Sequence, residues 1–290
     1  MTFSQILFPV DFSDRSAGAA PHVKEIADHF GSKVTLMNVL DTMRAFPVTG
    51  DFGVAYGYEM DTGALREQIQ VELDCFAREH LPNVCRGIHV DEGDPASAIT
   101  QFAQERGVDL IMMPSHGYGP FRSILLGSVT AKVLHDSECP VWTGAHLETT
   151  PPEGCLPYRN VLCAIDLSQR STGLIQWAGR LAESFHASLR LVHAVQPMAI
   201  LPDYPVGCQY EEDMRQDARR KIAEFEKEAG SKAAVCVAMG SPGDVVAEEA
   251  KRHDIDLVVI GRGCLQQKLG RLRTHAYSII RQTPCPVISI

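Results

Sequence analysis

The residues best suited to bind a ligand lie between positions 113 and 142. An apolar run leads into glycines at 117, 119 and 127, and a hydroxyl follows directly at Ser128. Glycines let backbone N–H groups approach an anion closely, and the start of a helix adds N–H groups without helical partners. The pattern therefore indicates a site for phosphate oxygens. It is not a Walker loop, because no lysine follows Gly127.

A simpler interpretation of the same residues stays open. The glycines could form only a turn, and Ser128 could do no more than cap a helix. Asp11 follows the first apolar run and could stabilise a turn or cap a helix in the same way. His116 stands beside Gly117, but the sequence places no carboxylate to orient it for acid–base chemistry. Ser13 and Ser16, with their counterparts Ser168 and Ser171, are expected to cap helices.

Composition restricts the class of protein. The hydrophobic content of 45%, the charged content of 22% and the formal net charge of −9 indicate a soluble, globular chain. The negative charge argues against nucleic acid as a partner. No apolar run approaches the roughly 20 residues that span a membrane, and the first residues lack the pattern of a secretory signal. Nine scattered cysteines without a CxxC pair favour a reducing, cytoplasmic location.

The chain contains two copies of one unit. Residues 6–13 (ILFPVDFS) match residues 161–168 (VLCAIDLS) at an offset of 155 positions. The further matches are 34–39 with 189–194, 93–95 with 240–242, 108–111 with 255–258, and 139–141 with 285–287. Internal repetition of this length predicts two domains, at 1–147 and 158–290, with a linker at 148–157 rich in proline and threonine.

Each copy alternates apolar runs with amphipathic helical patterns. In the first copy the runs are 5–10, 34–40, 84–90, 110–113 and 141–142, and the helical patterns are 16–30, 64–80, 96–106 and 127–136. Strands that are apolar throughout are typical of a parallel sheet covered on both faces. The sequence therefore predicts an α/β fold with two tandem doubly wound domains, each an open parallel five-stranded sheet flanked by helices. Such sheets bind ligands at the carboxyl ends of the strands, where Asp11 and the loop 114–128 are expected.

The first copy closely resembles the universal stress protein family, in its ATP-binding branch. The signature of that branch is G-x2-G-x9-G-[ST], and its spacing falls here on Pro114, Gly117, Gly127 and Ser128, so that three of four positions match. The resemblance also includes residues 8–13, 93–95, 125–130 and 139–141, and it covers essentially the whole chain, twice. It implies a Rossmann-like fold of the adenine nucleotide alpha hydrolase kind.

The resemblance also implies a ligand, ATP with Mg²⁺, and the residues that contact it. These are Pro9, Val10, Asp11 and Val39 around the base, Met113, Pro114 and His116 beside the adenosine, and Gly117, Gly127, Ser128, Val129 and Thr130 at the phosphates. Pro114 departs from the signature. Because proline fixes φ and lacks an N–H donor, we expect ATP binding to be weakened or altered there.

The second copy departs further from the signature. Gly261 occupies the first glycine position, but Cys264, Thr274 and His275 replace the next glycine, the last glycine and the serine. Asp166 is retained. Lys268, Arg271 and Arg273 could attract an anion, although basic residues in a solvated loop are common. We therefore expect the second copy to be mainly structural.

The resemblance implies, too, that domains pair through their last strands. Residues 140–142 and 286–290 are expected to pair within one chain, as an intramolecular pseudo-dimer that could form a homodimer.

The first functional hypothesis is a cytoplasmic tandem universal stress protein that binds ATP and regulates a stress response, with at most slow ATP hydrolysis. The alternative is a nucleotide-free interaction scaffold with a protein partner. A hydrolase or nucleotidyl transferase would need a positioned catalytic group that the sequence does not offer. The stretch 46–58, rich in glycine and aromatic residues, is expected to be a flap whose role is open.

Overall fold

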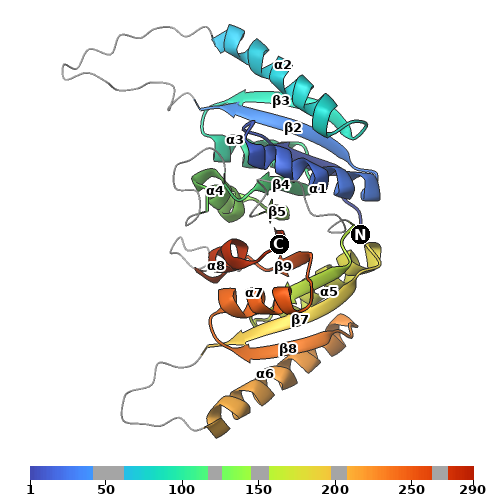
Figure 1. Ribbon diagram of the computed structural model, residues 1–290, viewed down its shortest axis with the longest axis vertical. Coiled ribbons are helices and arrows are strands. Elements are labelled where there is room, and N and C mark those ends of the chain that lie inside the picture. The colour runs from blue at the N-terminus through green and yellow to red at the C-terminus, as the bar shows by residue number, and fades with distance from the viewer. Residues whose placement is uncertain (42–61, 117–125, 145–156, 197–207, 263–273) are drawn as a thin grey trace, which may run out of the picture.

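The computed structural model describes residues 1–41, 62–116, 126–144, 157–196, 208–262 and 274–290 (Figure 1). The predicted flap at 46–58, Gly117 and nearly all of the predicted linker lie outside the described residues. In the part of the chain that is described, no helix is both long and apolar enough to cross a membrane.

The predicted alternation of strands and helices is confirmed in both copies. The elements of the first domain are β1 (Gln5–Pro9), α1 (Asp14–Phe30), β2 (Lys33–Leu40), α2 (Thr62–His80), β3 (Cys85–Glu92), α3 (Pro95–Glu105), β4 (Leu110–Pro114), α4 (Ser128–Asp136) and β5 (Val141–Gly144). Those of the second are β6 (Asn160–Ala164), α5 (Ser171–Ser184), β7 (Ser188–Val195), α6 (Cys208–Ala229), β8 (Ala234–Met239), α7 (Pro242–Arg252), β9 (Leu257–Ile260), α8 (Thr274–Gln282) and β10 (Val287–Ser289).

The first helix starts differently in the two copies. In α1 the N-cap is Ser13, whose hydroxyl accepts a hydrogen bond from the Ser16 amide. In α5 the N-cap is Arg170, which makes no side-chain capping bond, and Ser171 is the first helical residue. Capping is thus confirmed for Ser13 and wrong for Ser16, Ser168 and Ser171. Matching residues of the two copies lie 155 positions apart here, so the first residue of α1, Asp14, corresponds to residue 169. Helix α5 begins at Ser171 and therefore starts two residues later than α1.

The strands form one continuous ten-stranded sheet in the order β3-β2-β1-β4-β5-β10-β9-β6-β7-β8. Within each half the described strands pair in parallel, as predicted for a doubly wound domain. The halves join where β5 and β10 pair antiparallel, with Trp142 opposite Ile288 and Thr143 opposite Val287. The predicted pairing of the last strands within one chain is therefore confirmed, and it merges the two predicted sheets into one.

Helices cover both faces of this sheet across the two domains. One hydrophobic core packs α1, α2, α5 and α6 on the first face, and a second core packs α3, α4, α7 and α8 on the other. The inner strands β4 and β9 are buried on both faces, as is β1 apart from Gln5, which explains why these strands are apolar rather than alternating.

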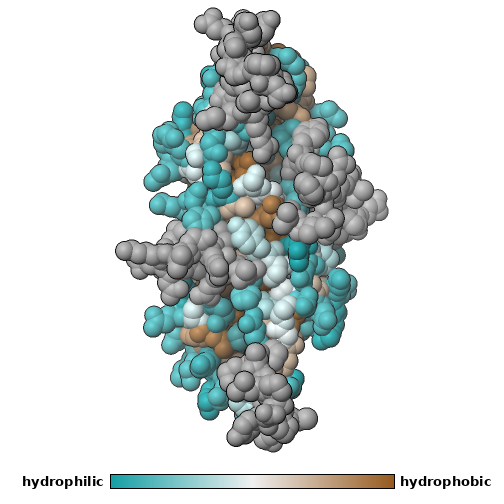
Figure 2. Space-filling model, turned by 90° about the vertical axis from the view of Figure 1, so that its left-hand side faces the viewer, coloured by the Kyte–Doolittle hydropathy of each residue, from teal (hydrophilic) through white to brown (hydrophobic). Residues whose placement is uncertain are grey.

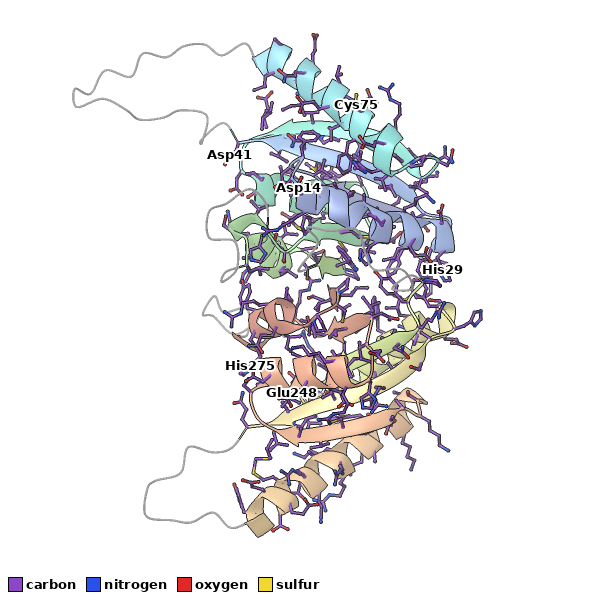
Figure 3. The ribbon with its side chains drawn as sticks, in the orientation of Figure 1. Asp14, His29, Asp41, Cys75, Glu248 and His275 are labelled. Carbon is purple, nitrogen blue, oxygen red and sulfur yellow. The ribbon has the colours of Figure 1, made fainter. Side chains whose placement is uncertain are left out.

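Three aromatic side chains lie together in the first core, near the junction of the domains. The Trp142 Nε1 atom donates to the Tyr158 hydroxyl at 3.2 Å, and the His22 Nδ1 atom lies 3.1 Å from the same hydroxyl. All three residues are buried, and burial lowers the pKa of His22 to about 4. Near the amino-terminal ends of the strands, the His29 ring (labelled in Figure 3) stacks on the Phe185 ring of the second domain, with 4.2 Å between the ring centroids.

Arg262 also joins the two domains. It follows β9, and its guanidinium donates to the carbonyl oxygens of Leu134, Ser137 and Cys139 at 3.3, 2.7 and 2.7 Å. These carbonyls belong to the last turn of α4 and to the segment that leads into β5. A side chain of the second domain therefore donates hydrogen bonds to backbone carbonyl groups at and after the carboxyl-terminal end of α4 in the first domain.

Candidate functional site

The strand order of the first domain reverses between β1 and β4. β1 pairs with β2 on one side and with β4 on the other, so that a crevice is expected at the carboxyl ends of β1 and β4. These ends lie on the left in Figure 1, and the view onto that side in Figure 2 shows patches of hydrophobic surface among hydrophilic residues. Asp11 follows β1, and Ser115 and His116 follow β4. The structure thus brings these predicted residues to neighbouring strand ends.

Asp11 stands in a sharply bent turn. The next residue, Phe12, has φ of 59°, in the left-handed region that a bulky residue rarely adopts. The Asp11 Oδ1 atom accepts from the Ser13 amide at 3.1 Å, from the Ser13 hydroxyl at 2.6 Å and from the Ser16 hydroxyl at 2.7 Å. The turn-stabilising interpretation of Asp11 is therefore correct as far as Oδ1 is concerned, and the same bonds fix the orientation of the carboxylate.

The residues predicted around the base lie on β1 and β2. Pro9 is the last residue of β1 and pairs with Met37, and the Val10 amide donates to the Met37 carbonyl at 2.9 Å. The Val10 carbonyl accepts from Asn38 Nδ2 at 2.8 Å. Val39 is half-buried near the carboxyl end of β2. The backbone of Val10 is thus largely committed to the protein itself.

The start of α4 packs tightly on the end of β4. The Gly127 amide donates to the Ser115 carbonyl at 2.8 Å, and the Thr130 hydroxyl donates to the Pro114 carbonyl at 3.0 Å. A Cβ atom at Gly127 would lie 3.3 Å from the Ser115 oxygen and 3.4 Å from the His116 Cα atom. A side chain at this position would press on the backbone of Ser115 and His116, so close packing by itself favours glycine here.

These bonds narrow the predicted phosphate contacts. The Gly127 amide and the Thr130 hydroxyl already have partners, so a phosphate role for Thr130 would rest on its amide. Gly127 is the N-cap of α4, and no side chain caps this helix. The first-turn amides at Ser128, Val129 and Thr130 are of the kind that a helix leaves without helical partners, and Ser128 is exposed. Amides at the start of a helix are of the kind that attract anions.

The remaining predicted residues lie close to this helix start. Met113 and Pro114 are buried at the end of β4. His116 is half-buried, and its Nδ1 atom lies 2.8 Å from the Ser115 hydroxyl. In the described ranges no group of three or more His, Cys, Asp or Glu side chains could hold a metal ion.

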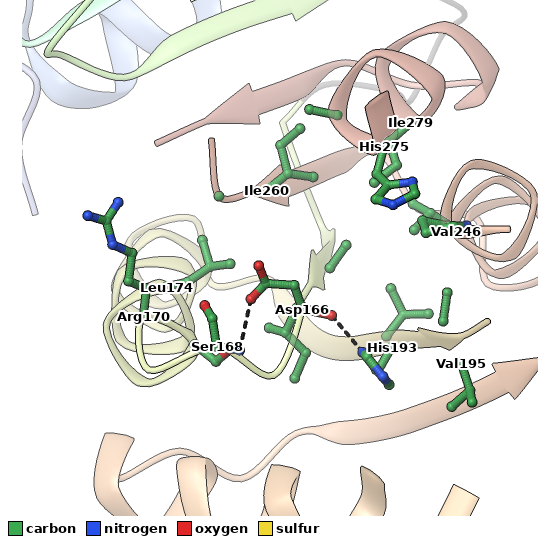
Figure 4. A pocket seen from close by; sticks show the side chains of 18 of the residues that line it. Asp166, Ser168, Arg170, Leu174, His193, Val195, Val246, Ile260, His275 and Ile279 are labelled. Atoms are coloured by element: carbon green, nitrogen blue, oxygen red, sulfur yellow. Dashed lines mark hydrogen bonds between the residues drawn. The ribbon is translucent and has the colours of Figure 1, made fainter. Parts of the chain in front are cut away.

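The second domain has the same reversal of strand order, between β6 and β9. A cavity of about 650 Å³ opens at their carboxyl ends, and Asp166 lines it (Figure 4). Leu167, at the position that matches Phe12, also has a positive φ, of 57°. We expected this copy to be mainly structural. The retained Asp166 and Ser171 were the sequence signals that could have indicated the cavity.

Comparison with known proteins identifies the family. The model of the universal stress protein family matches residues 2–143 and again residues 157–290. The chain belongs to the universal stress protein family. Universal stress protein MJ0577 of Methanocaldococcus jannaschii is 32% identical over 152 residues, which cover 48% of this chain and 93% of that protein. Universal stress protein YxiE of Bacillus subtilis is 28% identical over 145 residues, covering 48% and 97%.

The tandem arrangement also has a solved counterpart. A universal stress protein from Archaeoglobus fulgidus DSM 4304 aligns with a TM-score of 0.69 at 20% identity, covering 99% of this chain and 96% of that one. At this identity the likeness shows the fold alone. The universal stress protein described here therefore has two domains of the family, and the predicted α/β fold is confirmed.

Proposed function

We propose that the first domain of this universal stress protein binds ATP together with Mg²⁺. On this proposal the chain is a cytoplasmic, nucleotide-dependent regulator of a stress response, with at most slow ATP hydrolysis. The main support is the start of α4, which lacks a side-chain cap and lies beside β4, next to the strand that Asp11 follows. Amides and dipole at a helix start attract phosphate oxygens even in a chain of net charge −9.

The residues present fit the parts of a nucleotide. Asp11 would accept a hydrogen bond from the amino group of adenine, near Pro9, Val10 and Val39. The amides of Ser128, Val129 and Thr130 would hold the phosphates, with Gly117 as a further predicted contact. Mg²⁺ would be held by the phosphates and would neutralise part of their charge. Binding, rather than chemistry, is the task that these residues support.

A second candidate function is a nucleotide-free scaffold that acts through a protein partner. Two observations favour it: Pro114 lacks an N–H donor, and the Gly127 amide is already bonded to Ser115. A measurement of ATP binding distinguishes the two candidate functions. Pure, ligand-stripped protein that takes up no ATP in calorimetry with magnesium present would favour the scaffold.

We expect Gly127→Val to weaken ATP binding by at least about tenfold, or roughly 1.4 kcal/mol. The added side chain would press on Ser115 and His116 and displace the start of α4 from β4. Isothermal titration calorimetry of the full chain with Mg-ATP measures the change. Gly179→Val is the matched control, because a Cβ atom at Gly179 in α5 meets no atom within 4 Å. Equal affinities in wild type and Gly127→Val would contradict the proposed phosphate contacts.

We expect Asp11→Asn to weaken ATP binding by roughly five- to tenfold while leaving inorganic triphosphate binding unchanged. Asparagine keeps an oxygen that can accept from Ser13 and Ser16, so the turn is preserved. It loses the carboxylate that would face the adenine amino group. Parallel titrations with ATP and triphosphate separate the two parts of the ligand, and equal losses for both would argue against the adenine role.

A further inference from the structure

Helix α4, whose start is the proposed phosphate site, is short. It has nine residues, Ser128–Asp136, and its length is therefore about 13 Å. A helix of this length is not stable in isolation, so the groups that hold it determine where it lies. At its start the Gly127 amide and the Thr130 hydroxyl donate to carbonyl groups at the end of β4. In its last turns Val133 and Leu134 are buried in the second core.

The carboxyl-terminal end of α4 is held from the other domain. The Arg262 guanidinium donates to the carbonyl oxygens of Leu134, Ser137 and Cys139 at 3.3, 2.7 and 2.7 Å. The last carbonyls of a helix have no helical donors, so a side chain that reaches them stabilises that end, and a cation there also interacts favourably with the helix dipole. Helix α4 lies beside the junction of the domains (Figure 1). It is thus held at one end by its own domain and at the other by the second domain.

The first domain has a different side chain at the matching position. Arg262 corresponds to Ser115 at an offset of 147 residues. The two backbones agree, because the Ser115 amide donates to the Gly144 carbonyl at 2.9 Å and the Arg262 amide donates to the Ile290 carbonyl at 2.8 Å. The Ser115 hydroxyl lies 2.8 Å from the His116 Nδ1 atom, within its own domain. Only the arginine of this pair is long enough to reach across the junction.

A displacement at the end of α4 reaches its start. The helix is a short hydrogen-bonded rod, in which the Ala131 amide donates to the Gly127 carbonyl at 2.8 Å. The start has little room to move, because a Cβ atom added at Gly127 would lie 3.3 Å from the Ser115 oxygen. A tilt of the helix therefore changes the direction of its first-turn amides relative to β4. Hydrogen bonds weaken steeply as their angle departs from linear, so the hold on a bound phosphate weakens with the tilt.

We infer that Arg262 is a positioning residue for the phosphate-binding amides of α4, through which the second domain sets the affinity of the first domain for phosphate groups. It acts from the opposite end of the helix. This inference rests on the proposed function, and it gives the second copy, whose own signature is degenerate, a part in that function. The effect falls on the phosphates of the ligand and not on the adenine, which Asp11 would contact.

Calorimetry of the full chain, with magnesium and well below the unfolding temperature, tests this assignment. Arg262→Met is expected to weaken binding of ATP and of inorganic triphosphate by roughly fivefold each and to leave adenosine binding unchanged. Arg262→Lys separates position from charge, because an ammonium group keeps the charge but does not bridge the three carbonyls. An intermediate loss is expected for this variant, and wild-type triphosphate affinity in it would leave only an effect of charge and overturn the inference.

The outcomes for the inference and for the proposed function differ. If wild type binds triphosphate and Arg262→Met binds it equally well, or loses adenosine to the same extent, the inference is overturned and the proposed function stands. If wild type binds neither ATP nor triphosphate, both are overturned.

Hydrogen exchange of the ligand-free full chain gives a second readout, with Tyr158→Phe as the matched control. This variant also removes a hydrogen bond between the domains, the one from Trp142 Nε1, on the face of the sheet opposite to α4. Relative to the amides of α3 in the same protein, the Gly127 and Ala131 amides are expected to exchange at least about threefold faster in Arg262→Met than in Tyr158→Phe. Tyr158→Phe should keep the wild-type affinity for triphosphate. Equal exchange in the two variants, or an equal loss of triphosphate affinity, contradicts a specific role of Arg262.

Discussion

Replacing Arg262 with methionine is expected to lower the free energy of unfolding by about 3 kcal/mol. The guanidinium donates to the carbonyls of Leu134, Ser137 and Cys139, which lie 123 to 128 residues away in the chain. Methionine fills much of the same space but donates no hydrogen bond. Three carbonyls at the end of α4 and before β5 would lose their donor, and the contact between the domains would weaken.

Urea denaturation of the full chain measures this effect. Arg262→Lys should lie between wild type and Arg262→Met, because an ammonium group does not match the fork that reaches several carbonyls. Arg220→Met is the matched control. Arg220 on α6 pairs with Asp217 while 71% of its side chain is exposed, so its loss should change stability by no more than about 0.5 kcal/mol. Equal effects of the two methionine variants would show that the contacts of Arg262 contribute no more than a surface pair.

Acidification is expected to destabilise the protein through His22. The native pKa is lowered to about 4 from the ordinary value of 6.5, and burial is the cause. Above pH 6.5 the ring is neutral in both the native and the unfolded state, so it makes no difference to stability. As the pH falls from 6.5 towards 4, His22 becomes protonated in the unfolded state but stays largely neutral in the native state. His22 alone should therefore cost about 3 kcal/mol of stability by pH 4.

The comparison of variants isolates this contribution from other groups that titrate. His22→Phe should reduce the loss of stability between pH 7 and pH 4 by about that amount. Tyr158→Phe should retain the full pH dependence, because burial and not the Tyr158 hydroxyl lowers the pKa of His22. It should reduce stability at all pH values, since the Trp142 N–H group loses its acceptor. A constant free-energy difference between wild type and His22→Phe across this range would contradict the prediction.

Much of the fold could be predicted because its causes are local. Residues 6–10 and 110–113 are apolar, and the structure buries them in or directly after β1 and in β4, between helices on both faces of the sheet. Ser13 lies three residues before the amide that it accepts from, so a short pattern suffices to place this cap. The repeat required the same strand order in both halves, and the family resemblance implied that β5 and β10 pair.

The site was predicted less completely. The sequence places Gly127 at the start of a helix, but whether its amide faces a ligand or the Ser115 carbonyl depends on how α4 lies against β4. Substitutions in the signature of the second copy favoured a structural role there. The cavity depends instead on how β6, β7, β9, α5 and α8 surround it, which the local sequence does not show.

The sequence by itself determined the two α/β units, the order of their elements and the position of Asp11 after its strand, because burial periodicity and turn chemistry act over a few residues. Only the tertiary structure decided which distant groups meet. Arg262 reaches α4 across the junction of the domains, and Tyr158 joins Trp142 and His22. Ser171 lacks the partner that Ser16 has, because a helix starts two residues later. Hydrogen-bond partners are chosen by proximity in space, and that proximity exists only once both halves of the sheet have joined.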